Sequence, residues 1–361
     1  MKKKMLAVLL AGAMVASLTA CGGSNSADTA DTTKTEESGD SAEAADTKDA
    51  SEFKVGLITD VGGVNDGSFN QSSWEGLERA GEELGVTVNY LESATDADYA
   101  PNLETFVDED YDLIISVGYM LADATRAAAE ANPDTKFAII DDSSIDLPNV
   151  TSLIFHAEQA SYLVGYVAGL TTKTNNIGFV VGMTNETMNQ FGYGYYAGAK
   201  DANPDVTVQQ FNANSFADSA TGKTMANTAI TNGADIVFQA AGATGLGVIE
   251  ACQEAGVYAI GVDSLHSIAP NTVLTSAMKR VDNAVYEAVQ ELIDGTLEGG
   301  IKSFDLAAGG VDIAPSQDLI APEVITAVEE VKEKIVSGEV VVPADKESFE
   351  AKYGADAYQL D

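Results

Sequence analysis

Hydrophobic and polar positions follow two alternating periods from residue 53 to the end of the chain. Short apolar runs rich in Val, Ile and Leu alternate with longer segments in which apolar residues recur every three or four positions. The short runs are typical of strands buried on both faces, and the longer segments of helices with one buried face. Strands that alternate with helices in this way form a parallel sheet, so the pattern predicts an α/β fold.

The pattern divides into two similar series joined near residues 155–160. The first predicts strands over 54–59, 87–91, 113–117, 137–140 and 151–155, with helices over 71–84, 101–108, 122–131 and 157–170. The second predicts strands over 177–181, 206–211, 236–239 and 257–262, with helices near 190–201 and over 222–231 and 248–255. The last part of the chain adds a strand over 272–276, a helix over 281–294, short strands and a helix near 322–337. Two such series predict two lobes of like architecture, with room for a ligand between them.

The last part of the chain has to complete one or both sheets, so we expect it to cross between the lobes in several hinge segments. This expectation assigns residues 53–156 and about 278–310 to lobe I, and residues 157–277 and about 311–361 to lobe II. Each lobe is then a doubly wound parallel sheet. Ligand contacts are expected where its strands end.

The first strand ends in a polar turn that is the most informative segment of the chain. Asp60 stands at the carboxyl end of the strand, where open α/β sheets bind their ligands. Gly62, Gly63 and Gly67 allow backbone angles that other residues resist. Ser68 is a candidate N-cap for the helix that follows. An acid, an aromatic ring and an amide therefore converge on one turn.

Composition excludes several classes of partner. The 361 residues carry a formal net charge of −37, with 56 Asp and Glu against 19 Lys and Arg. Nucleic acids bind clustered Lys and Arg, so a chain this acidic is not expected to bind them. Anionic membrane surfaces are equally poor partners for the folded part.

The N-terminus has the form of a bacterial lipoprotein signal. Lysines at 2–4 precede an apolar stretch over 5–16, which is far shorter than the roughly 20 residues of a membrane-spanning helix. Residues 18–21, Leu-Thr-Ala-Cys, have the form of a lipobox. We therefore expect residues 1–20 to be removed and Cys21 to anchor the protein by lipid to the outer face of the cell membrane. A plain signal peptide that leaves Cys21 unmodified is the alternative.

An acidic segment follows this cysteine. Between Ser24 and Ser51, eight acids stand against two lysines, and no aromatic or large aliphatic residue occurs. Such a segment cannot bury enough apolar surface to fold, so residues 21–52 are expected to form a disordered, extended tether. A partner-binding acidic tail is the alternative. The other cysteine, Cys252, lies in an expected helix and is interpreted as a small buried hydrophobe.

Several segments together resemble the basic membrane lipoprotein family of ABC-transporter substrate-binding proteins, from about residue 53 to the C-terminus. The resemblance rests on Asp-Val-Gly-Gly-Val-Asn-Asp-Gly-Ser-Phe-Asn-Gln at 60–71, Glu-Gln at 158–159 with Gly165 and Gly169, Ile-Gly-Phe-Val-Val-Gly at 177–182, Ser-Phe-Ala-Asp at 215–218, Ala-Ala-Gly-Ala-Thr-Gly-Leu-Gly at 240–247, Ile-Gly-Val-Asp at 260–263 and Leu-Thr-Ser-Ala-Met-Lys at 274–279. It implies a lipoprotein that binds a purine nucleoside for an ABC importer, with permease and ATPase partners. The implied fold is the type I periplasmic-binding-protein fold.

The resemblance also implies roles for individual residues. In this family a purine stacks between two aromatic rings, polar side chains read the base edge, and an acid with a lysine holds the ribose hydroxyls. Matched by motif, the stacking pair is Phe69 and Phe216, and the ribose clamp is Asp263 and Lys279, with backbone groups of Ala241 and Gly242 beside it. The base-reading groups are Asp60, Asn70 and Asp141, and residues 118–120 are expected to line the cleft.

The residues themselves support these roles and leave alternatives open, because almost all of them stand at or just after the ends of expected strands. Phe69 could instead pack back on the sheet, and Asp263 could be a turn or cap residue. Lys279 could be a solvated lysine before the next helix. Asp141 and Asp142 could form a turn rather than an acid–base pair.

Apparent enzyme motifs are not expected to act as such. Residues 217–224 satisfy a loose P-loop pattern, but Ala217 replaces its first glycine and the preceding strand ends several residues earlier. Lys223 is then a solvated helix residue. The glycine runs at 192–198 and 242–247 have the wrong spacing for a dinucleotide fingerprint and indicate a helix start or a tight helix contact. The two histidines lie in different segments and assemble neither a metal site nor a Ser-His-Asp triad.

We therefore expect a monomeric nucleoside-binding protein that closes about its hinges and is not an enzyme. No cofactor and no metal are expected. A sugar or a signalling molecule bound in the same fold is the alternative, since flat sugar faces also stack on aromatic rings. An enzymatic surface lipoprotein is less well supported, because no nucleophile–base pair is visible.

Overall fold

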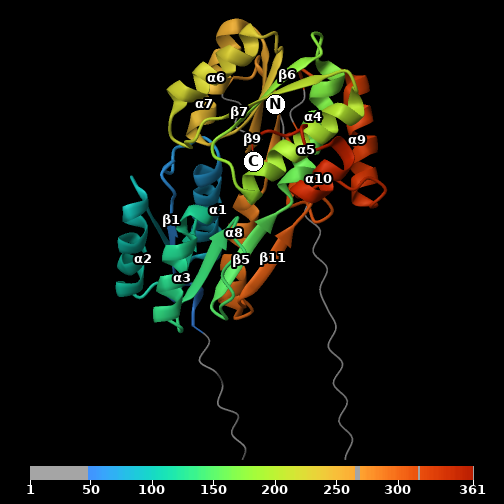
Figure 1. Ribbon diagram of the computed structural model, residues 1–361. Coiled ribbons are helices and arrows are strands. Elements are labelled where there is room, and N and C mark those ends of the chain that lie inside the picture. Colours follow the sequence, from blue (N-terminus) through green and yellow to red (C-terminus); the bar gives the residue numbers. More distant parts are fainter. Residues whose placement is uncertain (1–47, 265–268, 316–317, 361) are drawn as a thin grey trace, which may run out of the picture. The chain divides into compact units, whose positions relative to one another are not determined.

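The computed structural model describes residues 48–264, 269–315 and 318–360 (Figure 1). Cys21, the signal sequence and most of the acidic tether lie outside the described residues. Within the described ranges, no helix combines the length and the apolar character needed to span a bilayer.

Lobe I contains a six-stranded parallel sheet with the strand order β11-β5-β4-β3-β1-β2. Its strands are β1 (Lys54–Ile58), β2 (Thr87–Leu91), β3 (Leu113–Ser116), β4 (Lys136–Ile140), β5 (Val150–Phe155) and β11 (Gly300–Phe304). Its helices are α1 (Phe69–Leu84), α2 (Tyr99–Asp108), α3 (Ala122–Ala131) and α8 (Val281–Asp294). Helices α1 and α8 pack on one face of the sheet, and α2 and α3 on the other. Burial on both faces explains the continuous apolar runs of the central strands.

Lobe II contains a second six-stranded sheet with the order β12-β10-β9-β8-β6-β7. Its strands are β6 (Asn176–Val181), β7 (Thr207–Asn212), β8 (Ile236–Ala240), β9 (Tyr258–Asp263), β10 (Val273–Lys279) and β12 (Val311–Ile313). Its helices are α4 (Ala157–Thr171), α5 (Glu186–Ala202), α6 (Ser219–Thr231), α7 (Ala243–Ala255), α9 (Pro322–Val336) and α10 (Lys346–Tyr353). The edge strand β12 runs antiparallel to β10, so this sheet is mixed rather than wholly parallel as predicted.

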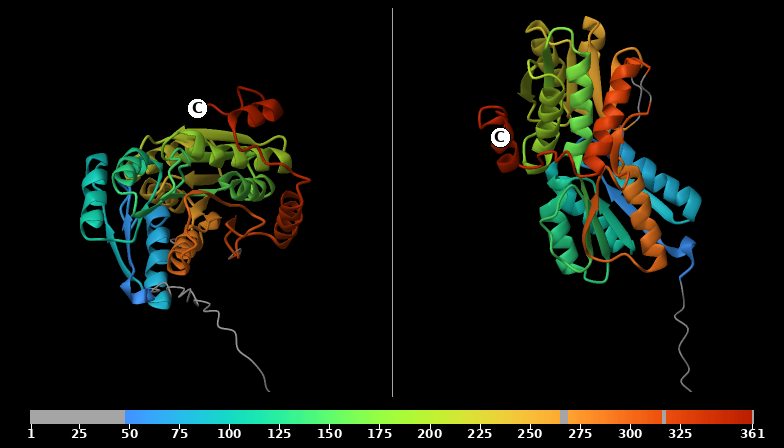
Figure 2. Two further views of the ribbon diagram at one scale, coloured as in Figure 1. Left: turned by 90° about the horizontal axis from the view of Figure 1, so that it is seen from below. Right: turned by 90° about the vertical axis from the view of Figure 1, so that its right-hand side faces the viewer.

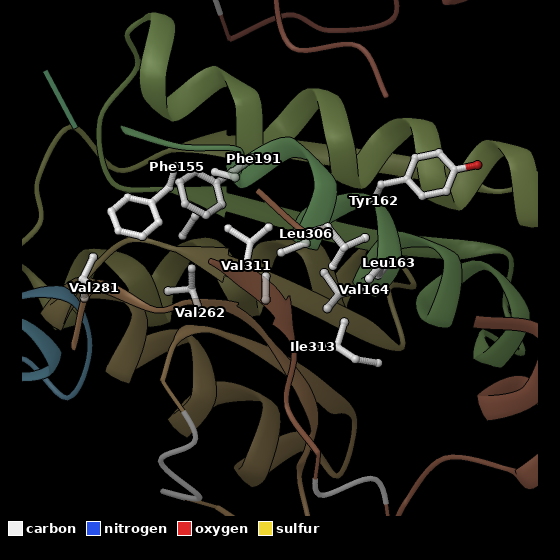
Figure 3. Close-up of a cluster of buried hydrophobic side chains, with 14 of the residues drawn as sticks. Phe155, Tyr162, Leu163, Val164, Phe191, Val262, Val281, Leu306, Val311 and Ile313 are labelled. Carbon is white, nitrogen blue, oxygen red and sulfur yellow. The ribbon is translucent and has the colours of Figure 1, made fainter. Parts of the chain in front are cut away.

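Three segments join the lobes: the link from β5 to α4, the link from β10 to α8, and the link from β11 to β12 (Figure 2). The largest buried apolar cluster contains residues from both lobes and continues past these links. Figure 3 shows members of this cluster from both lobes: Phe155 and Val281 belong to lobe I, and Phe191 and Val262 to lobe II. Leu306, from the link between β11 and β12, belongs to the same cluster. The hinge region is therefore packed like a core.

Glycines allow helices of lobe II to touch. A Cβ at Gly198 of α5 would lie 1.9 Å from the carbonyl oxygen of Tyr162 in α4. A Cβ at Gly247 of α7 would lie 1.8 Å from the carbonyl oxygen of Ser219 in α6. Any larger residue would push these helices apart. The prediction that these glycines mark a helix start or a tight helix contact is confirmed, since Gly242 also stands at the N-cap of α7.

Several predicted helix starts were too late, and at α5 and α6 a side-chain cap extends the helix. Helix α5 begins at Glu186 rather than near 190, since the Asn185 side chain accepts a hydrogen bond from the backbone N–H of Met188. Helix α10 was not predicted at all. It buries only Phe349, so its apolar periodicity is weak, and its start is fixed by the capping residue Asp345.

The end of the expected tether is ordered. Residues Ala50–Glu52 form a short 3₁₀ helix capped by Asp49, and Lys48 forms a 2.6 Å ion pair with Asp112 of lobe I. The prediction of a disordered segment up to residue 52 was therefore wrong for 48–52. A local cap and one charge partner supply contacts that the composition did not indicate.

Candidate functional site

A cavity between the lobes holds about 540 Å³ of space free of protein atoms, including the part open to solvent. Lobe I lines it with Asp60, Gly62, Asp66, Phe69, Asn70, Gly118, Tyr119, Met120 and Asp141. Lobe II lines it with Met188, Phe191, Phe216, Ala240, Ala241, Gly242, Val262, Asp263 and Lys279. Every ligand-binding residue predicted from the sequence therefore lies at one site, and so do residues 118–120.

The turn after β1 forms a closed hydrogen-bond network around Asn70. The Asn70 Nδ2 donates to Asp60 Oδ1 at 2.7 Å and to Asp66 Oδ2 at 2.9 Å, while its Oδ1 accepts from the Asp60 backbone N–H at 3.1 Å. An amide has two N–H donors, and both are in use. Asn70 therefore cannot donate to a ligand without breaking this network, and its observed contacts position Asp60.

Asp60 presents its second carboxylate oxygen to the cavity. Its Oδ1 accepts from Asn70 and from the Gly62 backbone N–H at 2.8 Å, whereas its Oδ2 faces Gly118 and has no hydrogen-bond partner among the described residues. Burial raises the pKa of Asp60 to about 6, against the lowering effect of these two hydrogen bonds. The group is therefore an acceptor whose charge a ligand donor would stabilise.

Ser68 does not cap α1 with its side chain, contrary to the prediction. Asp66 accepts the N-terminal backbone N–H groups of the helix instead, with Oδ2 bonded to Asn70 N at 3.0 Å and Oδ1 to Gln71 N at 3.1 Å. The Ser68 hydroxyl instead reaches lobe II. It donates to Asp263 Oδ2 of lobe II at 2.6 Å.

Asp263 is buried and only partly satisfied. One carboxylate oxygen accepts from Ser68, and the other, Oδ1, is buried without a hydrogen-bond partner among the described residues. Burial raises the pKa of Asp263 to about 6, although the nearby positive charge of Lys279 lowers it. A buried, unpartnered acceptor is costly, so the geometry favours a donor supplied by a ligand.

Lys279, the other predicted member of the ribose clamp, pairs with Asp141 across the lobes. Its Nζ donates to Asp141 Oδ2, and both side chains are buried. The ammonium also lies 4.3 Å from the centre of the Phe69 ring and 5.7 Å from that of Phe191. Lys279 is therefore a buried cation shared by both lobes, and the alternative of a solvated lysine is excluded.

Asp141 and Asp263 both adopt left-handed backbone angles, with φ of 63° and 65°. Asp141 directly follows the central strand β4, and Asp263 is the last residue of the central strand β9. Non-glycine residues in this region are uncommon and cluster at functional sites. The conformation turns both carboxylates into the cavity at the carboxyl ends of the sheets.

The two predicted stacking rings come from opposite lobes. Phe69 opens α1 and lies against Gly118, where a Cβ would be 3.3 Å from the ring. Phe216 packs against the backbone of lobe II at Gly182, where a Cβ would be 2.4 Å from its ring. Glycine at both places lets a ring lie directly on the chain. Beside Phe216, the Ala241 N–H already bonds to Gln239 Oε1 at 3.0 Å and is not free for a ligand.

Met188 and Phe191 of α5 were missed as cavity residues. Their spacing of three places them on one face of a helix, which was the available signal. The predicted helix began only near 190, so Met188 fell in a loop and the pair did not stand out. The late helix start therefore hid part of the site.

Other candidate groups are engaged elsewhere. Lys223 of the P-loop-like segment forms ion pairs with Glu250 and Glu254 at 2.9 Å each. Asp218 caps α6, and Cys252 is fully buried, as predicted. Among the described residues, no group of three or more His, Cys, Asp or Glu could hold a metal ion.

Comparison with known proteins gives consistent matches along the two lobes. Residues 53–346 match the model of the Bmp family, described as ABC transporter substrate-binding protein PnrA-like. The ABC transporter nucleoside-binding protein BmpA of Lactococcus lactis is 37% identical over 317 residues, which cover 81% of this chain and 90% of that protein. The CD4+ T-cell-stimulating antigen of Listeria monocytogenes is 41% identical over 317 residues, covering 81% and 89%.

A solved structure supports the same match. The solute-binding protein of an ABC transporter system from Aeropyrum pernix K1 superposes with a TM-score of 0.76 at 28% identity, covering 84% of this chain and 98% of that chain. The predicted fold class, a type I periplasmic-binding-protein fold of two doubly wound lobes, is confirmed by the two sheets and by this similarity.

Proposed function

We propose a ligand on the basis that this chain belongs to the PnrA-like family of ABC transporter substrate-binding proteins. The proposed ligand is a purine nucleoside, captured in the cavity between the lobes. Hinge closure would bring ligand groups held by lobe I onto lobe II. The named nucleoside-binding relative supports the ligand class. The protein would act as a binding protein that delivers ligand to a permease, and would not transform it.

One observation carries this proposal: Asp263, whose Oδ1 has no hydrogen-bond partner among the described residues, lines a cavity with aromatic rings from both lobes. A carboxylate can accept two hydroxyl hydrogens, which suits the cis-diol of a ribose. Phe69 and Phe216 offer flat apolar faces to a base. Asp60 Oδ2 is the acceptor best placed for an N–H on the base edge, and Asn70 then acts by orienting Asp60.

The charge of the lining favours a neutral ligand. Four acids, Asp60, Asp66, Asp141 and Asp263, line the cavity together with a single lysine, Lys279, which is already paired. A phosphate group would bring negative charge into this acidic, poorly solvated site. We therefore propose that nucleosides bind and that their monophosphates are rejected.

A thermal-shift and calorimetric panel tests the function. Guanosine, inosine and adenosine at micromolar concentrations should raise the melting temperature, because a ligand bound only to the folded state stabilises it. Ribose, galactose and guanosine monophosphate should not. Failure of every nucleoside to shift the transition would overturn the proposal, and a shift with galactose alone would assign a sugar ligand instead.

Phe69→Ala tests the stacking role. Base–aromatic stacking is worth about 1–3 kcal/mol, so guanosine affinity measured by calorimetry should fall by at least about tenfold. The melting temperature of the unliganded protein should change little, because Phe69 is only half-buried. Tyr286→Ala on α8, outside the cavity, is the control and should bind normally. Equal affinity of Phe69→Ala and wild type would make the ring structural.

Ligand affinity should fall as the pH drops below 6. Burial raises the pKa of Asp60 and Asp263 from 3.8 to about 6, so in acid the free protein holds protons that a hydrogen-bond donor from the ligand must displace. Each such group weakens binding by about tenfold per pH unit below its pKa. Calorimetry between pH 7 and 5 measures this loss of affinity. Asp60→Asn should remove the part of the pH dependence that is due to Asp60. An affinity that is constant over this range would contradict the two roles.

The same shifts affect stability with the opposite sign. Because both folded pKa values lie above the unfolded value of 3.8, the unliganded protein takes up protons on folding between about pH 4 and 6. This contribution to stability is complete below about pH 4 and is lost as the pH rises through 6.

Anchoring and domain boundaries complete the proposal. We propose that Cys21 carries lipid on the outer face of the membrane and that the acidic segment spaces the lobes from it. Lobe I would comprise residues 53–156 and about 280–310, and lobe II residues 157–279 and about 311–361, because β10 of the second sheet runs to Lys279 rather than ending at 277. Closure would occur about the three links between the lobes.

A further inference from the structure

The C-terminal segment, residues 346–360, lies against the outer face of α5. It consists of α10 and an irregular tail, and it follows α9 at the edge of lobe II (Figures 1 and 2). The match to the family model ends at residue 346, so nearly all of this segment lies beyond the matched residues. We refer to residues 346–360 as the C-terminal strap.

Two aromatic side chains of the strap are buried, Phe349 and Tyr358, and Tyr358 is the one that packs on Gly192 of α5. Its side chain is 4% exposed, and its ring lies directly on Gly192 of α5, where a Cβ would be 2.3 Å from a ring carbon. The hydroxyl donates to Asn189 Oδ1 at 3.3 Å. The ring also contacts Tyr193, with 4.8 Å between centroids. Tyr358 therefore packs against one turn of α5, between Asn189 and Tyr193.

The backbone on both sides of Tyr358 is tied to strand β7. Gln210 Nε2 donates to the carbonyl oxygen of Ala357 at 2.8 Å, and the Gln359 backbone N–H donates to Gln210 Oε1 at 2.9 Å. One side chain thus bonds to residues immediately before and after Tyr358. This arrangement sets how deeply the ring is inserted.

The turn of α5 that Tyr358 covers also lines the ligand cavity. Met188 and Phe191 face the cavity, and each precedes by one position a residue that Tyr358 contacts, Asn189 and Gly192. A helix is about 10–12 Å across, so its two sides move together. On the side of α4, Gly198 fixes the approach of α5. Helix α5 is therefore held between α4 and the strap.

We propose that the C-terminal strap is a positioning element for the ligand cavity and that Tyr358 sets the placement of Met188 and Phe191. Binding sites need their contact groups held within about 0.5 Å, so loosening this turn of α5 should weaken ligand binding without touching the ligand. The choice of guanosine as the test ligand rests on the proposed function. The role of the strap in placing Met188 and Phe191 does not depend on which ligand binds.

Tyr358→Ala is the primary variant, and it is compared with Tyr353→Ala. Tyr353 belongs to the same strap but bonds to Asp201 at the far end of α5, at 3.0 Å. Tyr358→Ala should weaken guanosine binding by at least about tenfold, and Tyr353→Ala by less than about twofold, even if both lower the melting temperature. Tyr358→Phe keeps the ring and should bind within about threefold of wild type. An equal loss of guanosine affinity in Tyr358→Ala and Tyr353→Ala would mean that the strap stabilises the fold and does not position the cavity residues.

A second readout needs no nucleoside. The methyl resonance of ¹³C-labelled Met188 in the unliganded protein should shift in Tyr358→Ala and stay in place in Tyr353→Ala. If wild type binds no nucleoside, the function fails while this resonance still tests the strap. If Tyr358→Ala does not fold, Gln210→Leu replaces it as the test variant. This substitution removes both hydrogen bonds between β7 and the strap at a partly exposed residue, and it should shift the same Met188 resonance. An unmoved Met188 resonance in the folded variants would overturn the proposal.

Discussion

Asp263→Asn is expected to weaken guanosine binding by about 100-fold, because two charge-assisted hydrogen bonds to ribose hydroxyls are worth about 1.5–3 kcal/mol each and the amide retains only part of them. Asparagine suits the test. It tolerates the φ of 65° at this position and can still accept the hydrogen bond from Ser68. The backbone and the contact between the lobes should therefore persist, and only the charged acceptor is lost.

The free base distinguishes this role from a general defect. Guanine lacks the ribose, so its affinity for Asp263→Asn should fall by less than about threefold. Calorimetry with guanosine and guanine on both proteins measures the difference. Asp205→Asn, an exposed carboxylate of the same lobe, is the matched control and should bind as wild type does. Equal losses for nucleoside and base would sink the ribose assignment.

Lys279→Met should have the largest effect on stability, lowering the free energy of unfolding by about 3–5 kcal/mol at pH 7. Lys279 is 3% exposed and is the cation beside both Asp141 and Asp263. Methionine fills similar space but leaves buried carboxylates without a counter-charge. Breaking a buried pair from one side costs more than replacing the whole pair.

A double-mutant cycle separates the charge effect from packing. Asp141→Asn in the Lys279→Met background removes one uncompensated charge, and asparagine accepts the φ of 63° there. Urea unfolding should then recover at least about half of the lost free energy. Lys332→Met breaks a partly exposed pair with Asp312 and should cost no more than about 1 kcal/mol. If Lys279→Met proves as stable as wild type, the pair between the lobes contributes nothing.

Much of the fold could be predicted because its signals are local. Strands such as β2 and helices such as α3 and α8 were placed at their observed bounds from apolar periodicity alone. Errors occurred where a side chain overrides the pattern, as at the Asn185 cap of α5, or where burial is too small to leave a pattern, as in α10. Composition could not reveal the cap and ion pair that order residues 48–52.

The membership of the site could also be predicted, since residues at the carboxyl ends of parallel strands meet at one edge of a sheet. Asp60, Asp141 and Asp263 follow this rule and line one cavity. The family resemblance supplied Phe216, which its own loop did not distinguish. The roles of these residues still await the experiments above.

The sequence by itself determined the two-lobed architecture and the positions at which ligand groups stand, because both depend on periodicity and on neighbours along the chain. Only the tertiary structure decided which groups pair. Ser68 meets Asp263 across 195 positions, Lys279 meets Asp141 across 138, and Asn70 uses both of its donors on nearby acids. Hydrogen bonds and ion pairs depend on distances of a few ångströms between side chains, and packing of the two lobes sets those distances.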